Sequence, residues 1–153
     1  MHSSRLVARD KTVRMDREKA LARAAAVPVA RFATVSVRTG AVDLVPVTFV
    51  LAHGRFVTVV DHKPKTTRAL ARLANVRAGA EVTVLIDHWA DDWSRLWWVR
   101  LRGSAEVVDD MARPDIVTAV GSLVEKYPPY RAHRPAGPVI VLTVGSVRSW
   151  SAS

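Results

Sequence analysis

The chain has 153 residues, 49% of them hydrophobic and 24% charged, which is typical of one folded domain with a substantial core and excludes a largely disordered chain. It has no cysteine, which excludes disulfides, iron–sulfur clusters and thiolate zinc sites, and its five histidines show no metal-binding spacing, so no metal site is predicted. No run approaches the ~18 apolar residues of a membrane span. The net charge of +9 favours anionic partners. The lack of cysteine also fits a reducing cytoplasm, the location we expect.

The first part of the chain is predicted to contain a basic extension, a helix and three strands. Residues 1–14 are expected to be a flexible extension, and residues 15–153 to form a single domain. Asp16 can cap a helix that continues to about Ala26. Pro46 lies within the second of the strands and indicates an edge, a bulge or a switch between strands. The three strands are expected over residues 29–37, 42–52 and 55–60.

The second part is predicted to alternate helices with three further strands. A helix is expected over 66–76, and its apolar residues share one face: Leu70, Leu73 and Val76. Another helix is expected over 109–126, with Pro114 in its first turn. The remaining strands are expected over residues 80–86, 95–108 and 139–150. Six strands joined mostly by tight turns predict a mainly β, α+β domain, whose largely antiparallel sheet can close into a barrel.

Positive charge gathers between the third strand and the helix that follows it. Lys63, Lys65 and Arg68 lie there together with Thr66 and Thr67. Helix N-termini expose backbone N–H groups and a partial positive charge, so one interpretation is a site for a phosphate-bearing ligand. The other is a solvated helix start capped by one of the threonines. The motifs GxGxxG and GxxxxGK[ST] are both absent, so neither a dinucleotide-binding fold nor a P-loop is indicated.

Tryptophan is concentrated before and within the fifth predicted strand, at Trp89, Trp93, Trp97 and Trp98. Trp97 and Trp98 are adjacent in the strand and therefore point to opposite faces. We expect a second covered surface, either a subunit interface or a flat aromatic ligand, with ordinary packing as the alternative. Arg95 and Arg100 either contact that ligand or form salt bridges with aspartates of the preceding loop. Tryptophans at an interface argue against nucleic acid, and no nucleic-acid or membrane partner is expected.

Five segments carry a resemblance to a known family: residues 63–67, the helix with Leu70, Leu73 and Asn75, and residues 84–89, 91–100 and 126–131. In this order and spacing they resemble the pyridoxamine-phosphate-oxidase-like split-barrel family, in its actinobacterial branch that uses the deazaflavin coenzyme F420. The resemblance covers about residues 16–151. It implies a six-stranded split β-barrel of the FMN-binding type with flanking helices. It also implies a homodimer with two coenzyme sites at the subunit interface.

The resemblance assigns coenzyme-binding positions in three groups. The ring would be lined by Val47, Thr48 and Phe49, and the ribityl chain would lie over Val59 and Val60. The phosphate would be held by Lys63, Lys65 and Thr66, with Arg68 nearby. Trp98 would face the ring from the second subunit, with Arg100 and Trp150 in the same region. No catalytic residue is assigned, and the candidate proton donors are Asp61, His62, Tyr127 and Tyr130.

The activity that the resemblance implies is an F420-dependent oxidoreductase, which transfers a hydride between the deazaflavin and an unsaturated small-molecule substrate. The acidic lactyl-oligoglutamate tail of F420 also explains the excess positive charge better than FMN does. Two alternatives stay open: an FMN-dependent oxidoreductase of the same fold, and a non-catalytic F420-binding protein. The sequence does not identify the substrate.

Overall fold

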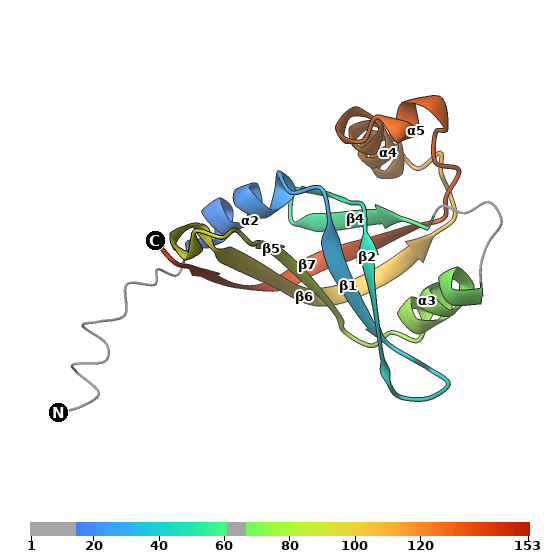
Figure 1. Cartoon of the computed structure of the whole chain (residues 1–153). Coiled ribbons are helices and arrows are strands. Elements are labelled where there is room, and N and C mark those ends of the chain that lie inside the picture. The colour runs from blue at the N-terminus through green and yellow to red at the C-terminus, as the bar shows by residue number, and fades with distance from the viewer. Residues whose placement is uncertain (1–14, 61–66) are drawn as a thin grey trace.

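The computed structural model describes residues 15–60 and 67–153, in which one curled antiparallel sheet is surrounded by helices (Figure 1). The strands of the described residues are β1 (Ala30–Val35), β2 (Val42–Val47), β3 (Val50–Ala52), β4 (Arg55–Val59), β5 (Val82–His88), β6 (Trp97–Val108) and β7 (Val139–Ser151). Hydrogen bonds join them in the order β2-β1-β5-β6-β7-β4-β3. The predicted mainly β, split-barrel fold with flanking helices is confirmed.

The two edge strands of the sheet, β2 and β3, are consecutive in the chain. Only Thr48 and Phe49 separate them. Val47 and Val50 are three Cα steps apart, at most about 11 Å. The sheet must therefore curl until its two edges approach each other, which produces the half-barrel.

This division of residues 42–52 corrects two predictions. One continuous strand was expected there, and six strands in all, whereas the described residues form seven. The chain leaves one edge of the sheet after Val47 and joins the opposite edge at Val50. Pro46 lies in an edge strand, where its missing N–H costs no ladder hydrogen bond, so the expected edge or strand switch is confirmed.

Long helices flank the sheet, and shorter ones lie in its connections: α2 (Arg17–Ala25), α3 (Thr67–Arg77), η1 (Trp93–Arg95), α4 (Pro114–Lys126) and α5 (Pro129–Ala132). Asp16 caps α2 as predicted, because its carboxylate accepts the N–H of Lys19 at 2.8 Å. The predicted apolar face of α3 is partly wrong. Leu73 and Val76 are buried, but Leu70 is 51% exposed and Ala69 is buried in its place.

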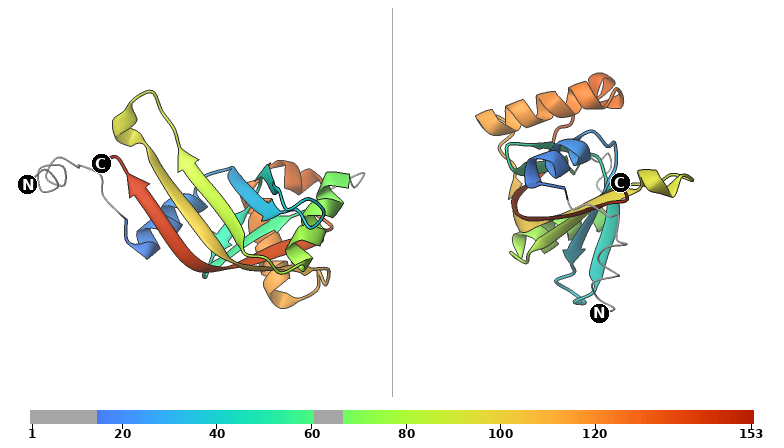
Figure 2. Two further views of the ribbon diagram at one scale, coloured as in Figure 1. Left: turned by 90° about the horizontal axis from the view of Figure 1, so that it is seen from below. Right: turned by 90° about the vertical axis from the view of Figure 1, so that its left-hand side faces the viewer.

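The apolar side chains form two clusters on opposite faces of the sheet. The larger one fills the barrel, where Phe32 and Phe49 each stack on Phe56, with ring centroids 6.2 and 5.0 Å apart. The second lies under α4, whose Ile116, Val120 and Leu123 pack on β4 and β7. Figure 2 shows α4 along one side of the sheet, and the β5–β6 connection with η1 projecting away from it.

Candidate functional site

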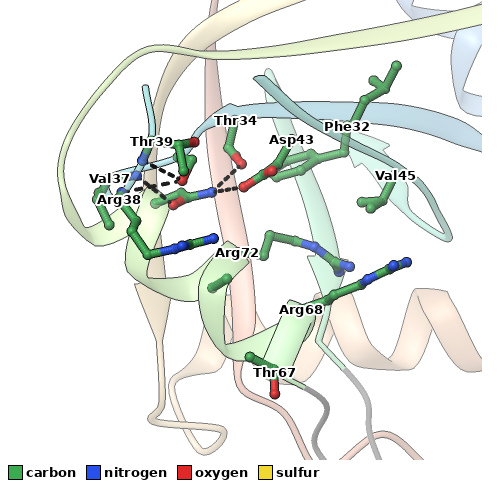
Figure 3. Close-up of a pocket in the computed structure, with 14 residues that line it drawn as sticks. Phe32, Thr34, Val37, Arg38, Thr39, Asp43, Val45, Thr67, Arg68 and Arg72 are labelled. Atoms are coloured by element: carbon green, nitrogen blue, oxygen red, sulfur yellow. Dashed lines mark hydrogen bonds between the residues drawn. The ribbon is translucent and has the colours of Figure 1, made fainter. Parts of the chain in front are cut away.

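The first candidate site is a cavity of about 540 Å³ between α3 and the β1–β2 hairpin, which we call the arginine pocket. Strands β1 and β2 contribute Phe32, Thr34, Asp43 and Val45 to its wall, and three arginines also line it: Arg38 from the hairpin turn, Arg68 and Arg72 from α3. Figure 3 shows Arg38 reaching from the hairpin toward α3, and the side chains of Arg68 and Arg72 extending in the same direction. One pocket thus collects three guanidinium groups.

A buried asparagine holds the wall of the arginine pocket together. The side-chain amide of Asn75 in α3 donates to Thr34 Oγ1 at 3.0 Å and to Asp43 Oδ2 at 2.8 Å. Its oxygen accepts the backbone N–H of Val37 at 3.2 Å. Both amide protons are therefore used, in a residue that is 2% exposed. This network fixes the hairpin against α3 and sets the spacing of the arginines.

Among the described residues, the positive charge of the arginine pocket exceeds its negative charge. Within residues 15–60 and 67–153, the guanidinium groups of Arg38, Arg68 and Arg72 form no ion pair. Asp43 also lines the pocket, but its carboxylate is bound to the Asn75 amide and offsets only one of the three positive charges. Burial lowers the pKa of Arg72, which means that its charge lacks full solvation. Arg68 and Arg72 are one helical turn apart, a spacing at which like charges repel. An anion would relieve both costs.

The second candidate site is the outer surface of β5, β6 and β7 near the ends of β6 and β7 that hold Trp98 and Trp150. These two residues are cross-strand partners. With Leu85, Trp89 and Arg100 they line a shallow cavity of about 250 Å³. We call these five residues the tryptophan face.

Large apolar groups of this region meet solvent. Trp89 is 71% exposed and Leu85 is 36% exposed, and the Trp93 ring, 69% exposed, lies 6.3 Å from that of Trp89. Arg100 places its guanidinium carbon 5.7 Å from the Trp98 ring centre. Its Nε is buried without a hydrogen-bond partner among the described residues. An exposed apolar surface with a buried, unsatisfied donor is typical of a surface that is covered by a ligand or a partner.

Residues 17–151 match the family model for pyridoxamine 5′-phosphate oxidase. The chain belongs to this family. The expectation drawn from the five segments is confirmed at the level of the family. No curated protein matches the chain closely enough to add a nearer relative.

Similar solved structures show the same fold. An FAD-binding protein from Mesorhizobium loti has 15% identity and a TM-score of 0.70, over 94% of this chain and 99% of that chain. An FAD-binding protein from Mycobacterium smegmatis has 12% identity and a TM-score of 0.58, over 91% and 96% of the two chains. A heme-binding protein from Mycobacterium smegmatis has 20% identity and a TM-score of 0.64, over 88% and 52%. At these identities the likeness establishes the fold alone.

The coenzyme positions that the family resemblance assigned fall into separate places. Arg68 lies in the arginine pocket, and Trp98, Arg100 and Trp150 lie together in or beside the tryptophan face cavity. The predicted phosphate residues Lys63, Lys65 and Thr66 lie outside the described residues, as do Asp61, His62 and the predicted extension over residues 1–14. Within one chain, no cavity described above contains both Arg68 and Trp98.

The residues predicted to contact the ring and the ribityl chain are mostly buried. Val47, Phe49, Val59 and Val60 have buried side chains in the two clusters. Thr48 is half-buried, and its hydroxyl shares a hydrogen bond of 2.7 Å with the hydroxyl of Tyr130. These five line neither the arginine pocket nor the tryptophan face cavity. A ligand over this segment would meet the Thr48 side chain and little else of these side chains.

Tyr127, the other tyrosine considered as a proton donor, is held by hydrogen bonds to backbone groups. Tyr127 Oη accepts the N–H of Phe49 at 3.0 Å and donates toward the carbonyl of Pro28 at 2.9 Å. Burial raises its pKa.

The salt bridges considered for Arg95 and Arg100 do not form among the described residues. Asp92 instead accepts hydrogen bonds from the N–H and the hydroxyl of Ser94, at 3.0 and 2.6 Å.

Sequence reasoning missed two of the three pocket arginines. Arg72 follows Arg68 by four residues, so helical spacing alone places both on one face. Arg38 had no local signal, because it reaches the pocket only when the hairpin folds over α3.

No group of metal-ligating side chains occurs in the part of the chain that the structure describes. Within the same part, no helix combines the length and apolarity that crossing a bilayer requires.

Proposed function

We propose that the chain is an F420-dependent oxidoreductase that works as a homodimer and transfers a hydride between the deazaflavin coenzyme and an unsaturated small molecule. The observation that carries this proposal is the arginine pocket, where three guanidinium groups and a single carboxylate, that of Asp43, line one cavity, and none of the three arginines forms an ion pair among the described residues. Membership of the pyridoxamine 5′-phosphate oxidase family supports the class of chemistry.

The residues present suit an acidic coenzyme. F420 carries a phosphate and, beyond it, a lactyl-oligoglutamate tail, so it brings several negative charges in a row. Arginine forms paired hydrogen bonds with phosphates and carboxylates, and each such charged contact contributes about 1.5–3 kcal/mol. Arg68, Arg72 and Arg38 offer three such contacts in the arginine pocket. FMN has a phosphate and no acidic tail, so it would use fewer of them.

When bound, the coenzyme supplies the hydride chemistry, and the chain positions it and excludes water. The arginine pocket would hold the acidic part. Thr48 would meet the ring at the β2–β3 junction, where the Tyr130 hydroxyl fixes the orientation of the Thr48 hydroxyl. Trp98 and Trp150 of a second subunit would shield the ring. Lys63, Lys65 and Thr66 remain the proposed phosphate residues.

The tryptophan face supports the proposed homodimer. In a lone chain Trp89 and Leu85 stay exposed and Arg100 Nε stays unsatisfied. Burial of aromatic side chains is the main source of affinity at protein interfaces. In a two-fold dimer the tryptophan face of each subunit would lie against the other subunit, over the junction where Thr48 meets the ring, so that both faces are covered in the same way.

A second candidate is a flavin-dependent oxidoreductase or a flavin-binding protein on the same fold. The observation that favours it is that two similar solved structures are FAD-binding proteins. Tight binding of a coenzyme without turnover would instead indicate the non-catalytic F420-binding protein.

A fluorescence titration with F420, run beside FMN and FAD, tests these assignments. We expect F420 to bind at a micromolar dissociation constant or tighter, about −8 kcal/mol, and the flavins to bind more weakly. Arg72→Gln should weaken F420 binding about ten-fold or more. The matched control is Arg134→Gln, because Arg134 is exposed and lies outside the arginine pocket but carries the same charge. Selective binding of FMN or FAD would mean that the coenzyme is a flavin rather than F420. Equal effects of Arg72→Gln and Arg134→Gln on F420 binding would reject the arginine pocket as the binding site.

A further inference from the structure

A third cavity, of about 740 Å³, lies between α4 and the β3–β4 hairpin. It shares no lining residue with the arginine pocket or with the tryptophan face cavity. Along β7 it reaches Val141, nine residues before Trp150, which corresponds to about 30 Å of strand. The volume is within the range of small-molecule sites, about 300–1,000 Å³. We call this cavity the α4 groove.

The floor of the α4 groove is apolar. Val50, Val57 and Val141 come from the sheet, and Ile116 and Ala119 from α4. Two hydroxyls of α4 also line it, Thr118 and Ser122, but each donates to a helix carbonyl four residues earlier, at 3.2 Å. Their protons are therefore used. The walls thus favour a ligand that is apolar over most of its length.

The charges at the two ends of the α4 groove differ in their partners. At the β4 end, Arg55 pairs with Asp115 at 3.1 Å. Arg113 pairs with Asp115 at 2.7 Å and with Glu106 at 3.0 Å, so two cations face two carboxylates. At the other end Lys126 has no ion pair within the described residues. The groove therefore has one cation without a counter-charge.

The ammonium group of Lys126 is held in place by neutral groups. Nζ donates to the carbonyls of Ala25 and Phe49, both at 3.0 Å, and lies 3.7 Å from the centre of the Phe49 ring. These contacts come from α2 and from the β2–β3 link, and they use two of its three protons. Burial lowers its pKa to about 8. A carboxylate at the third proton would supply the missing negative charge, and the groove leads from there along the apolar floor.

We propose that the α4 groove is a second binding site, which takes an amphipathic monocarboxylate with its carboxylate on Lys126 Nζ and its apolar part along Val50, Val57, Ile116 and Val141. The α4 groove shares no lining residue with the arginine pocket, and the proposal stands if the proposed F420 dependence fails. Glu125 also lines the groove but is exposed, and the raised pKa of Tyr127 keeps its hydroxyl neutral near pH 7.

Calorimetric titration with decanoate and with decanol tests the site, since the two probes share an apolar chain and differ in charge. We expect one decanoate per chain and at least ten-fold weaker binding of decanol. Lys126→Met should remove that preference by weakening decanoate about ten-fold while leaving decanol unchanged. Ala119→Phe keeps Lys126 and fills the floor, so it should abolish binding of both probes.

Two further comparisons separate the α4 groove from other sites. Arg72→Gln in the arginine pocket should leave decanoate binding unchanged. Raising the pH from about 7 to about 9 should weaken decanoate binding to the parent chain, because Lys126 loses its proton near pH 8, and should have no effect on Lys126→Met. The proposal is overturned if decanoate does not bind, if decanol binds equally well, or if Lys126→Met and Ala119→Phe, both folded by circular dichroism, bind decanoate as the parent does.

Discussion

At the scale of single residues, Asn75 decides the shape of the arginine pocket. Its amide contacts Thr34, Asp43 and Val37 from a fully enclosed position. Asn75→Ala would leave the buried Thr34 hydroxyl without this partner, and the partly buried Asp43 carboxylate and Val37 N–H would have to turn to water. Each unsatisfied buried group costs about 1–3 kcal/mol. We therefore expect the free energy of unfolding, measured in urea, to fall by about 2–4 kcal/mol.

The control for Asn75 is Ser122→Ala, which removes a hydroxyl that bonds only to its own helix. This change should alter the free energy of unfolding by less than about 0.5 kcal/mol. A similarly small effect of Asn75→Ala would mean that the hairpin is held by other contacts, and it would remove the basis for the arginine spacing.

Lys126 gives the stability a dependence on pH. Its pKa is about 8 in the folded chain against an ordinary 10.5, so between these values the folded chain binds fewer protons than the unfolded chain. The free energy of unfolding should therefore rise with pH across this window. Tyr127 acts in the opposite direction above its ordinary pKa of 10.0, because burial raises its pKa and the folded chain then keeps a proton that the unfolded chain loses.

The effect of Lys126 on the free energy of unfolding is therefore not opposed by that of Tyr127 between pH 8 and pH 10. Urea unfolding at several pH values within this range should show a rising free energy for the parent chain and a smaller slope for Lys126→Met. Equal slopes for the two chains would contradict the assignment of the effect to Lys126.

The sequence alone indicated the binding role proposed for Arg68 but not the one proposed for Lys126. Arg68 was singled out because it follows a cationic run at a helix start, and it does line a pocket. Lys126 was noticed only as part of a motif. Its burial depends on α2 and on the β2–β3 link, whose contacting residues are 101 and 77 residues away along the chain. A contact of that range has no local signature.

At the scale of elements, the long pair β6–β7 depends on a glycine. The register between these strands shifts between Arg102 and Gly103. A Cβ at Gly103 would overlap the carbonyl oxygen of Thr143 in the facing strand. The bulge therefore requires the absence of a side chain rather than a special backbone angle.

Gly103→Ala should destabilise the fold by about 1–3 kcal/mol or more, as overpacking against a rigid backbone does. Gly121→Ala is the matched control, because Gly121 lies inside α4 with open space around its Cα. It should stabilise by about 0.5–1 kcal/mol through helix propensity. Thermal unfolding of both variants measures the difference, and a neutral Gly103→Ala would show that the strands can shift apart.

Most elements were predictable from periodicity, and the exceptions have tertiary causes. Residues 42–52 are apolar throughout much of their length, so Pro46 indicates an edge or a switch, but nothing local shows that the chain changes edge at Thr48. Leu70 has helical spacing with Leu73, but Ala69 is the residue that packs inward. Strand β4 is buried on both faces because α4 covers its outer side, which the sequence of β4 cannot reveal.

At the scale of the whole molecule, the outer surface of β7 carries two different environments. Near Val141 the surface is covered by α4, and near Trp150 it is the tryptophan face. The chain covers the first region itself and leaves aromatic groups of the second in solvent. Sequence reasoning anticipated the second region because two adjacent tryptophans in one strand cannot both enter the same core.

This contrast leads to a test of the homodimer. Trp98→Arg places a second charge in the middle of the tryptophan face, beside Arg100, and burying that charge against the other subunit without an acidic partner would be costly. Analytical ultracentrifugation should show a dimer for the parent chain and a monomer for Trp98→Arg at the same concentration. Val117→Arg is the control. Val117 is 50% exposed on α4 and lies outside the tryptophan face, so an arginine there adds the same charge to a different surface. This variant should remain dimeric. A parent chain that sediments as a monomer at all concentrations would reject the dimer. A Trp98→Arg dimer would move the interface elsewhere, and F420 binding by that variant would then show whether the coenzyme needs Trp98 at all.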